Sequence, residues 1–281
     1  MARITLGNRD GTLAVRHGRA VLEALAGEWP DLHLTIKTIP HADKQDSSAL
    51  LDALLKSKID VAVVQLDTLP FALPEGVNLA AVTRRADARS ALVAKGHKTL
   101  ADIGRGTKVG VFSDRDATFL EAAGNGSVAV LLDDSPENEL SRLAGGELGG
   151  VLLPAATMLG LELRDRIDFY LEIDAFTPAP GQGAVGLVVR DDDDLAFDTV
   201  YALQHRPSFD RIRAERAFAG ALADRPVGAV ATVTVDGELT LLGAVVENDT
   251  TLQASVTGEA REAEDLGKEL AQDVLERSKK L

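Results

Sequence analysis

Histidine and cysteine, the residue types that most often bind metals or act as nucleophiles, are scarce in this chain. The 281 residues include five histidines and no cysteine. No two of the histidines are four residues apart, the spacing that brings two ligands onto one helix face: they are His17, His33, His41, His97 and His205. Without a thiol the chain can form neither a disulfide nor a thiolate metal site, and it cannot hold a cofactor through a thioether. We therefore expect no metal site and no sulfur-linked cofactor.

Motifs for nucleotide binding and acyl transfer are also missing. Residues 104–108 lack the spacing of a P-loop, no G-x-G-x-x-G follows an expected strand, and there is no G-x-S-x-G. The formal net charge of -14 repels polyanions, so we expect neither nucleic acid nor an anionic membrane as a partner. No apolar stretch approaches the ~18 residues that cross a bilayer, and no apolar signal segment opens the chain, which favours the cytoplasm.

The elements that would position a site alternate between short β-branched runs and amphipathic helical patterns, which is typical of α/β units on largely parallel sheets. Ser47 or Ser48 is expected to cap one of the helices. The first block has expected strands at 3–6, 32–39 and 60–65 and helices at 13–26 and 47–56. The second block, which resembles a second copy of the first, has strands at 91–94, 109–112, 128–132 and 150–153 and helices near 117–123 and 137–144.

From about residue 209 the pattern changes. A helix at 211–223 is followed by three strands with alternating polarity and by a charged helix at 262–279. Asp236 and Gly237 form a strong hairpin signal between the first two of these strands. This region predicts an α+β domain with an antiparallel sheet.

Four segments, in order along the chain, resemble the hydroxymethylbilane synthase (porphobilinogen deaminase) family. Residues 178–186, PAPGQGAVG, are similar to the family's hinge, where we expect Gln182 to fix the hinge. Residues 60–82, DVAVVQLDTLPFALPEGVNLAAV, resemble the family stretch D-I-A-V-H-S-L-K-D-V-P-x-x-L-P-E-G-L-x-L-A-A-V. Residues 3–15, RITLGNRDGTLAV, and 214–222, AERAFAGAL, resemble the family's N-terminal segment and the helix before its cofactor loop.

The resemblance implies an α/β fold of three domains: two periplasmic-binding-protein-like α/β lobes around a cleft, and a small α+β C-terminal domain with an antiparallel sheet. The boundaries that follow are 1–84 with 184–205 for the first lobe, 85–183 for the second, and 206–281 for the C-terminal domain. A small-molecule ligand in the interdomain cleft is the partner this fold implies. The sequence names no protein partner.

The family acts in tetrapyrrole (haem) biosynthesis. It condenses four porphobilinogen molecules, with release of ammonia, on a dipyrromethane primer held by a thioether to a cysteine. The family's cofactor loop, G-G-C-x-x-P-[IV]-G-A, stands here as LADRPVGA, residues 222–229, which is shorter and has no cysteine. Because a thioether needs a thiolate nucleophile, we expect this chain to carry no dipyrromethane.

The catalytic aspartate that the resemblance implies is also replaced. In the family motif H-S-L-K-D-V-P the aspartate stabilises the pyrrole nitrogens; its position here is Thr68, and Asp67 takes the place of the lysine before it. Threonine cannot carry a negative charge near neutrality, so it cannot stabilise a developing cation. Asp67 is the only catalytic candidate, if a small adjustment of its loop brings the carboxylate into the cleft. The alternative is an ordinary solvated loop carboxylate.

Most of the basic residues that hold the carboxylates of the family's growing chain are missing too. Asp133 and Glu139 stand where two arginines belong, and Met158 replaces a third. An acid in place of an arginine repels an anionic ligand, so we expect a cleft poorer in positive charge, suited to a neutral or cationic ligand. The candidate ligand-binding residues are Arg9, Gln65, Thr68, Ser113 and Arg115.

These departures leave three interpretations open. The favoured one is a degenerate family member that lacks standard porphobilinogen polymerisation and keeps a binding or regulatory role. The second is a diverged transferase that condenses porphobilinogen or a related pyrrole on a non-covalent primer, with Asp67 as the acid. The third is a scaffold for a partner enzyme.

Overall fold

A computed structural model describes residues 2–40, 47–94, 96–124, 126–222 and 225–279. Contacts divide the chain into two compact units, Met1–Ala86 with Gly183–Phe209, and Asp87–Gln182 with Asp210–Leu281. Within these described ranges no helix is both long and apolar enough to span a bilayer.

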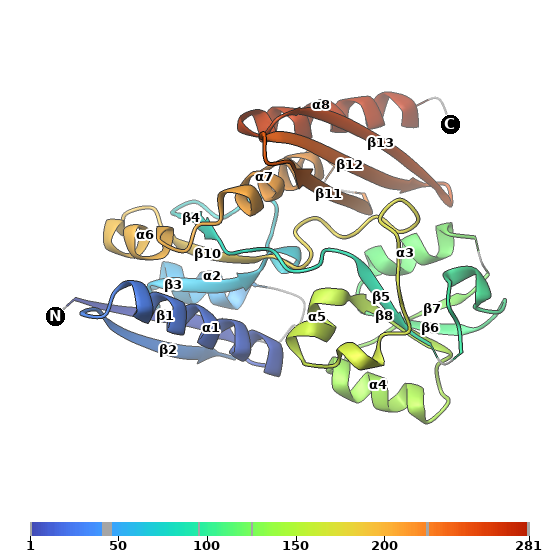
Figure 1. Ribbon diagram of the computed structural model, residues 1–281, viewed down its shortest axis with the longest axis horizontal. Helices are drawn as coiled ribbons and strands as arrows, with labels where there is room; N and C mark the ends of the chain where they lie inside the picture. The colour runs from blue at the N-terminus through green and yellow to red at the C-terminus, as the bar shows by residue number, and fades with distance from the viewer. Residues whose placement is uncertain (1, 41–46, 95, 125, 223–224, 280–281) are drawn as a thin grey trace. The chain divides into compact units, whose positions relative to one another are not determined.

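The first unit is built on a five-stranded mixed sheet in the order β2-β1-β3-β10-β4 (Figure 1). Strands β1, β2 and β3 are parallel, whereas β10 runs antiparallel to both of its neighbours. The bounds are β1 Arg3–Arg9, β2 His33–Ile39, β3 Val61–Gln65, β4 Val77–Val82 and β10 Val185–Arg190. The late strand β10 thus lies between two early strands.

Three helices of the first unit accompany this sheet: α1 (Thr12–Glu28), α2 (Ser48–Leu55) and α6 (Asp194–Tyr201). In α1 the buried residues are Gly18, Val21 and Leu25, a spacing of three and four that places them on one helix face. That face packs with Ile4, Leu6, Val61, Val63, Leu187 and Val189 of the sheet. The β-branched and leucine-rich strands expected from the sequence therefore form the core of the unit.

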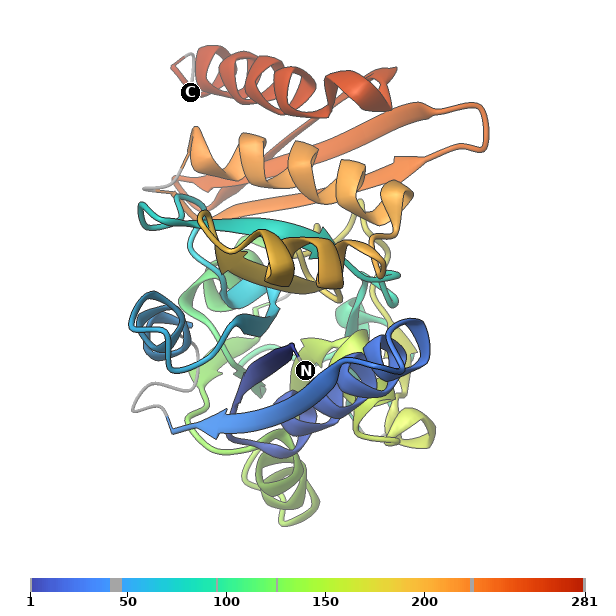
Figure 2. The ribbon, with the colours of Figure 1, turned by 90° about the vertical axis from the view of Figure 1, so that its left-hand side faces the viewer.

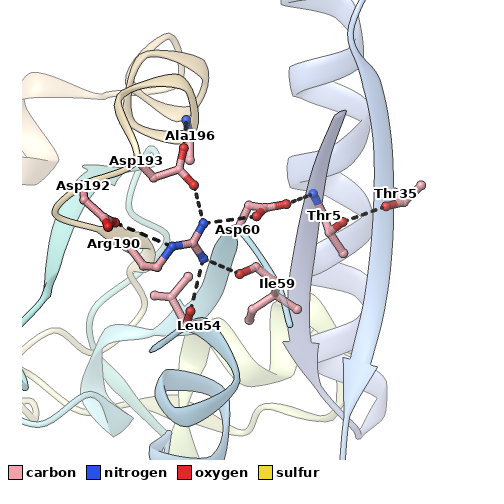
Figure 3. Close-up of polar contacts among 9 residues, drawn as sticks. All are labelled: Thr5, Thr35, Leu54, Ile59, Asp60, Arg190, Asp192, Asp193 and Ala196. Carbon is pink, nitrogen blue, oxygen red and sulfur yellow. Dashed lines mark hydrogen bonds and ion pairs between the residues drawn. The ribbon is translucent and has the colours of Figure 1, made fainter. Parts of the chain in front are cut away.

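Arg190, at the end of β10, ties three parts of the first unit together (Figure 3). Its guanidinium donates to the carbonyl oxygens of Leu54 at 3.1 Å and Ile59 at 2.8 Å. It also pairs with the carboxylates of Asp60 and Asp193. Asp60 in turn accepts the backbone N–H of Thr5 at 2.8 Å, which links β1 to the cluster. The acidic run at 191–194 therefore serves both as a partner of Arg190 and, through Asp193, as the cap of α6.

A second five-stranded mixed sheet, in the order β7-β6-β8-β5-β9, lies in the second unit. As in the first sheet, three parallel strands are followed by an antiparallel one, so the two sheets share one arrangement. The strands are β5 Ser90–Val93, β6 Lys108–Val111, β7 Val128–Leu131, β8 Gly150–Pro154 and β9 Phe169–Tyr170. The helices are α3 Asp114–Ala122, α4 Pro136–Ala144 and α5 Ala155–Gly160.

The second unit also holds the antiparallel sheet β11-β12-β13. Asp236 and Gly237 form the predicted turn between β11 and β12, with Gly237 at a φ of 84° that favours glycine. A Cβ at Gly243 would meet both Phe218 and Leu270, so α7 and α8 pack on the same face of this sheet. Figure 2 shows α8 running along the sheet. The bounds are α7 Arg206–Gly220, β11 Val227–Val233, β12 Glu238–Glu247, β13 Thr250–Glu259 and α8 Ala263–Ser278.

The opposite face of the antiparallel sheet joins the core of the second mixed sheet. Ala244 and Val246 of β12 belong to the same buried cluster as Phe119 of α3 and Phe176. Successive residues of a strand point to opposite faces, so one face of β12 packs against α7 and α8 and the other packs against the core of the second mixed sheet. This shared core explains why contacts place residues 87–182 and 210–281 in one unit.

The predicted fold class is confirmed: two mixed α/β sheets and a C-terminal antiparallel sheet. The strands β4 and β9 were not expected individually. One follows a loop rich in proline, and the other has only two residues, too few for an alternation to be read. The three domain boundaries given above stay a prediction.

Candidate functional site

Four of the six predicted site residues lie at one edge of the first sheet. Arg9 is the last residue of β1, and Gln65 is the last residue of β3. Because β1 and β3 are parallel neighbours, their carboxyl ends meet at the same edge. The carboxyl ends of parallel strands are the usual position of ligand sites in α/β sheets.

Thr68 is the last residue of the 3-10 turn Leu66–Thr68 that follows β3. Its hydroxyl makes two hydrogen bonds within the first unit. Its Oγ1 donates to the carbonyl oxygen of Gln65 at 2.9 Å. Oγ1 also lies 2.9 Å from Oγ of Ser47, a residue that is 1% exposed. A hydroxyl has one proton, so Ser47 must be the donor to Thr68. Thr68 therefore stabilises the turn from inside and holds no charge there.

The pairing with Thr68 corrects one detail of the sequence analysis. Ser47 occupies the N-cap position of α2, but its side chain makes no capping hydrogen bond. The hydroxyl is instead directed to the turn after β3. Sequence reasoning missed this contact because a serine before a helix is normally interpreted as a cap.

Asp67 lies in the middle of the same turn and is half-buried. The structure thus brings Gln65, Asp67 and Thr68 together on one short segment, with Asp67 as its one ionisable side chain. A carboxylate can hold or release a proton and can stabilise a nearby cation, whereas the amide and the hydroxyl can only hydrogen-bond.

The other two predicted residues, Ser113 and Arg115, lie in the second unit at the start of α3. Ser113 caps the helix by accepting the backbone N–H of Asp116 at 3.1 Å. Arg115 donates through Nε to the carbonyl oxygen of Val227 at 3.0 Å, and it also donates to the carbonyl oxygen of Thr177. It pairs with Asp116 at 2.7 Å. A ligand-binding role for Arg115 would have to compete with these contacts.

Glu139, which the sequence analysis aligned with an arginine of the family, is completely buried. One carboxylate oxygen accepts the backbone N–H of Asp134 at 3.3 Å, and the other pairs with Arg142 at 2.9 Å. This acid is therefore used to fix the loop before α4.

Gln182 and Glu215 hold the segment at 178–183, which resembles the family hinge. Gln182 Nε2 donates to the carbonyl oxygen of Ala88 at 2.7 Å and to Ser90 at 3.2 Å, in line with the expected fixing role. Glu215, at 0% exposure, accepts the backbone N–H groups of Gly181 and Ala231. Sequence reasoning did not single out Glu215. Its signal is a carboxylate that follows Ala214 and precedes Phe218 on α7, among apolar residues that are buried, because a buried acid must find donors.

The residues present do not fit a thioether-linked dipyrromethane. The chain has no cysteine at any position. Of the segment that corresponds to the cofactor loop, residues 223 and 224 lie outside the described residues, and β11 begins at Val227. Thr68 holds no charge, and the donors of Arg115 are directed to the carboxylate of Asp116 and to the backbone carbonyl groups of Thr177 and Val227. No cluster of metal-binding side chains occurs in the described part of the chain.

The fold and this site define a protein with two mixed α/β lobes and a C-terminal antiparallel sheet. Residues 4–198 match the family described as porphobilinogen deaminase, dipyromethane cofactor binding domain, and residues 209–276 match the porphobilinogen deaminase C-terminal domain. The chain therefore belongs to the porphobilinogen deaminase family of tetrapyrrole biosynthesis.

Similar proteins include the porphobilinogen deaminases of Thermus thermophilus and Deinococcus radiodurans. The first is 40% identical, with 98% of this chain and 96% of that one covered. The second is 36% identical, with 99% and 96% covered. A solved structure of a pheromone cOB1 precursor/lipoprotein of the YaeC family from Enterococcus faecalis matches with a TM-score of 0.50 and 16% identity. That match covers 76% of this chain and 97% of the other, and it speaks for the fold alone.

Proposed function

We propose that this chain is a degenerate member of the porphobilinogen deaminase family that lacks standard porphobilinogen polymerisation and keeps a small-molecule binding or regulatory role. The observation that carries the proposal is the state of Thr68. At the position of the family's aspartate stands a hydroxyl that donates to Gln65 and accepts from Ser47. A group used in this way offers neither a charge nor a proton to a substrate.

Charge and thiol content support the same proposal. The primer of the family reaction needs a thiolate, and this chain has none. The net charge of -14 also opposes the binding of a polycarboxylate chain. A neutral ligand bound through Arg9, Gln65 and Thr68, or a cationic ligand bound beside Asp67, fits these residues better. The cytoplasm is the compartment we propose for this role.

The experiment is an assay of the purified chain with porphobilinogen, which follows substrate loss and the appearance of linear tetrapyrrole. We expect no turnover above that of a heat-denatured sample. A Thr68→Asp variant should also be inactive, because restoring the carboxylate does not supply a primer site. Turnover of several substrate molecules per chain by the unmodified protein would contradict the proposal.

A second candidate function rests on Asp67. This carboxylate lies one residue before Thr68 at the sheet edge, and the relatives that match almost the whole chain are named as porphobilinogen deaminases. In this alternative Asp67 stabilises the developing cation, and a free dipyrromethane or tripyrrole acts as primer.

The two functions are separated by adding a soluble primer to the same assay. The alternative predicts primer-dependent turnover that an Asp67→Asn variant loses by about 100-fold or more, the usual contribution of a catalytic acid. Asp60→Asn is unsuitable as a control because Asp60 belongs to the Arg190 cluster, so the exposed Asp52 is changed instead. No primer-dependent turnover would leave the degenerate function as the better account.

A further inference from the structure

Arg115 contacts backbone carbonyl groups, a carboxylate and aromatic rings at the same time. Its side chain is 13% exposed. The guanidinium lies over the ring of Phe119, 3.8 Å from the centroid, and near that of Phe176, at 5.4 Å. Burial lowers its pKa, and the neighbouring Asp116 acts in the opposite direction. The cation is thus largely buried, lies over the ring of Phe119 and pairs with the carboxylate of Asp116.

The remaining donors of Arg115 join two distant parts of the second unit. Val227, whose carbonyl oxygen accepts from Nε, is the first residue of β11. Thr177, whose carbonyl oxygen also accepts, lies in the segment before β10. The arginine of α3 therefore holds the start of the C-terminal sheet and this connecting segment at the same time.

Further hydrogen bonds fasten the same connecting segment to the C-terminal sheet. Gln253 of β13 donates to Thr177 Oγ1 at 2.9 Å and to the carbonyl oxygen of Asp174 at 3.2 Å. The backbone N–H of Ala229 donates to the carbonyl oxygen of Pro178 at 2.9 Å. Residues 174–178 are thus hydrogen-bonded to β13 at Asp174 and Thr177 and to β11 at Pro178.

Packing at Gly228 shows how closely the guanidinium approaches β11. A Cβ at this position would lie 2.6 Å from a terminal nitrogen of Arg115 and 2.9 Å from the Thr177 backbone. Only glycine leaves room for the guanidinium here. The carbonyl oxygens of Thr177 and Val227 occupy acceptor positions that a ligand carboxylate would otherwise take.

We infer that Arg115 is a positioning residue: it fixes the start of β11, and with it the end of the preceding loop, to the second mixed sheet by means of the chain's own backbone. The C-terminal sheet is then held in place by α3, by Gln253 and by the shared core. A covalently attached dipyrromethane is not needed to hold it there. The inference goes beyond the proposed function, because it holds whether or not the chain turns over porphobilinogen.

The first test uses the NMR signal of the Arg115 Nε–H group, assigned by its loss in an Arg115→Lys variant. If Arg115 is a positioning residue, its Nε–H should exchange slowly with solvent. The chemical shift of this group should also stay unchanged when porphobilinogen is added at millimolar concentration. A ligand-binding arginine predicts fast exchange and a shift on titration. Either of these last two results would overturn the inference.

The second test follows backbone hydrogen exchange in an Arg115→Ala variant. Amides of residues 227–231 and 176–179 should exchange about tenfold faster or more, because three hydrogen bonds are lost, while amides of β3 in the first unit stay unchanged. Millimolar guanidinium should restore part of the protection, and the same concentration of sodium should not. Unchanged exchange at 227–231 would contradict the inference.

A Gln253→Ala variant provides an independent route to the same connecting segment. It removes a different side chain from the same connecting segment and should accelerate exchange at 174–178 in the same direction. Arg261→Ala is the matched control, since Arg261 is an exposed arginine of the same unit that pairs only with nearby glutamates. It should change none of these amides.

Discussion

Glu215 and Gly181 are joined by a hydrogen bond of 2.8 Å from the backbone N–H of Gly181 to a completely buried carboxylate. The second carboxylate oxygen accepts the N–H of Ala231 at 2.7 Å. One side chain of α7 thus fixes both the hinge-like segment and β11. Hydrogen bonds to a charged acceptor are stronger than neutral ones, so this contact is a principal support of the second unit.

A Glu215→Gln substitution should lower the free energy of unfolding by about 2–4 kcal/mol, because the amide group would face one of the two N–H donors. Urea unfolding measures this directly. Glu238→Gln, at the exposed start of β12, is the control and should change the value by less than about 0.5 kcal/mol. A loss for Glu215→Gln as small as that of the control would show that the two backbone donors contribute little.

Arg190→Ala should destabilise the first unit by about 3–5 kcal/mol, because it leaves Asp60 and Asp193 without their cation and removes the hydrogen bond to the carbonyl oxygen of Ile59. Thermal and urea unfolding with a probe in the first unit would record the loss. Lys56→Ala removes an exposed pair with Asp52 and should cost less than about 0.5 kcal/mol. Equal effects of the two variants would refute the structural role of the cluster in Figure 3.

Acid should weaken the fold in part through His17. Burial lowers the pKa of His17 below its ordinary value of 6.5. The unfolded chain then takes up this proton first, so the free energy of unfolding falls as the pH drops through 6.5 toward the folded-state pKa. Above pH 6.5 the effect is absent. A His17→Gln variant should therefore lose less stability between pH 7.5 and pH 5 than the unmodified chain.

The control for His17 is His33→Gln, which changes an exposed histidine on β2. It should leave the slope of stability against pH unchanged over the same range. The slope is the informative quantity, because a glutamine at the buried position can lower the stability at every pH by a constant amount. An unchanged slope in His17→Gln would contradict the assignment.

The sequence predicted the strands and helices of the core well because their patterns are local. Runs such as Val61–Gln65 and Val128–Leu131 are rich in valine and bounded by turn residues, and Asp236-Gly237 predicted the hairpin for the same reason. The sequence could not predict that β12 serves two cores, since Ala244 and Val246 read like any alternating strand residues.

The candidate site shows a similar limit. The exchange of aspartate for Thr68 is visible in the sequence, but its hydrogen bonds to Gln65 and Ser47 depend on tertiary structure. For Arg115 the partners are backbone carbonyl groups, which leave no signature in side-chain identity. A weak signal was present: Phe119 lies four residues after Arg115 on the same helix face, where a cation and a ring can meet.

We expect this member of the porphobilinogen deaminase family to carry no covalently attached primer. Intact mass spectrometry of the denatured protein, taken after purification and again after incubation with porphobilinogen, would detect such a primer by its mass. Both samples should have the mass of the unmodified chain, because no thiol is present to form a thioether. An adduct of two pyrrole units that survives denaturation would contradict it.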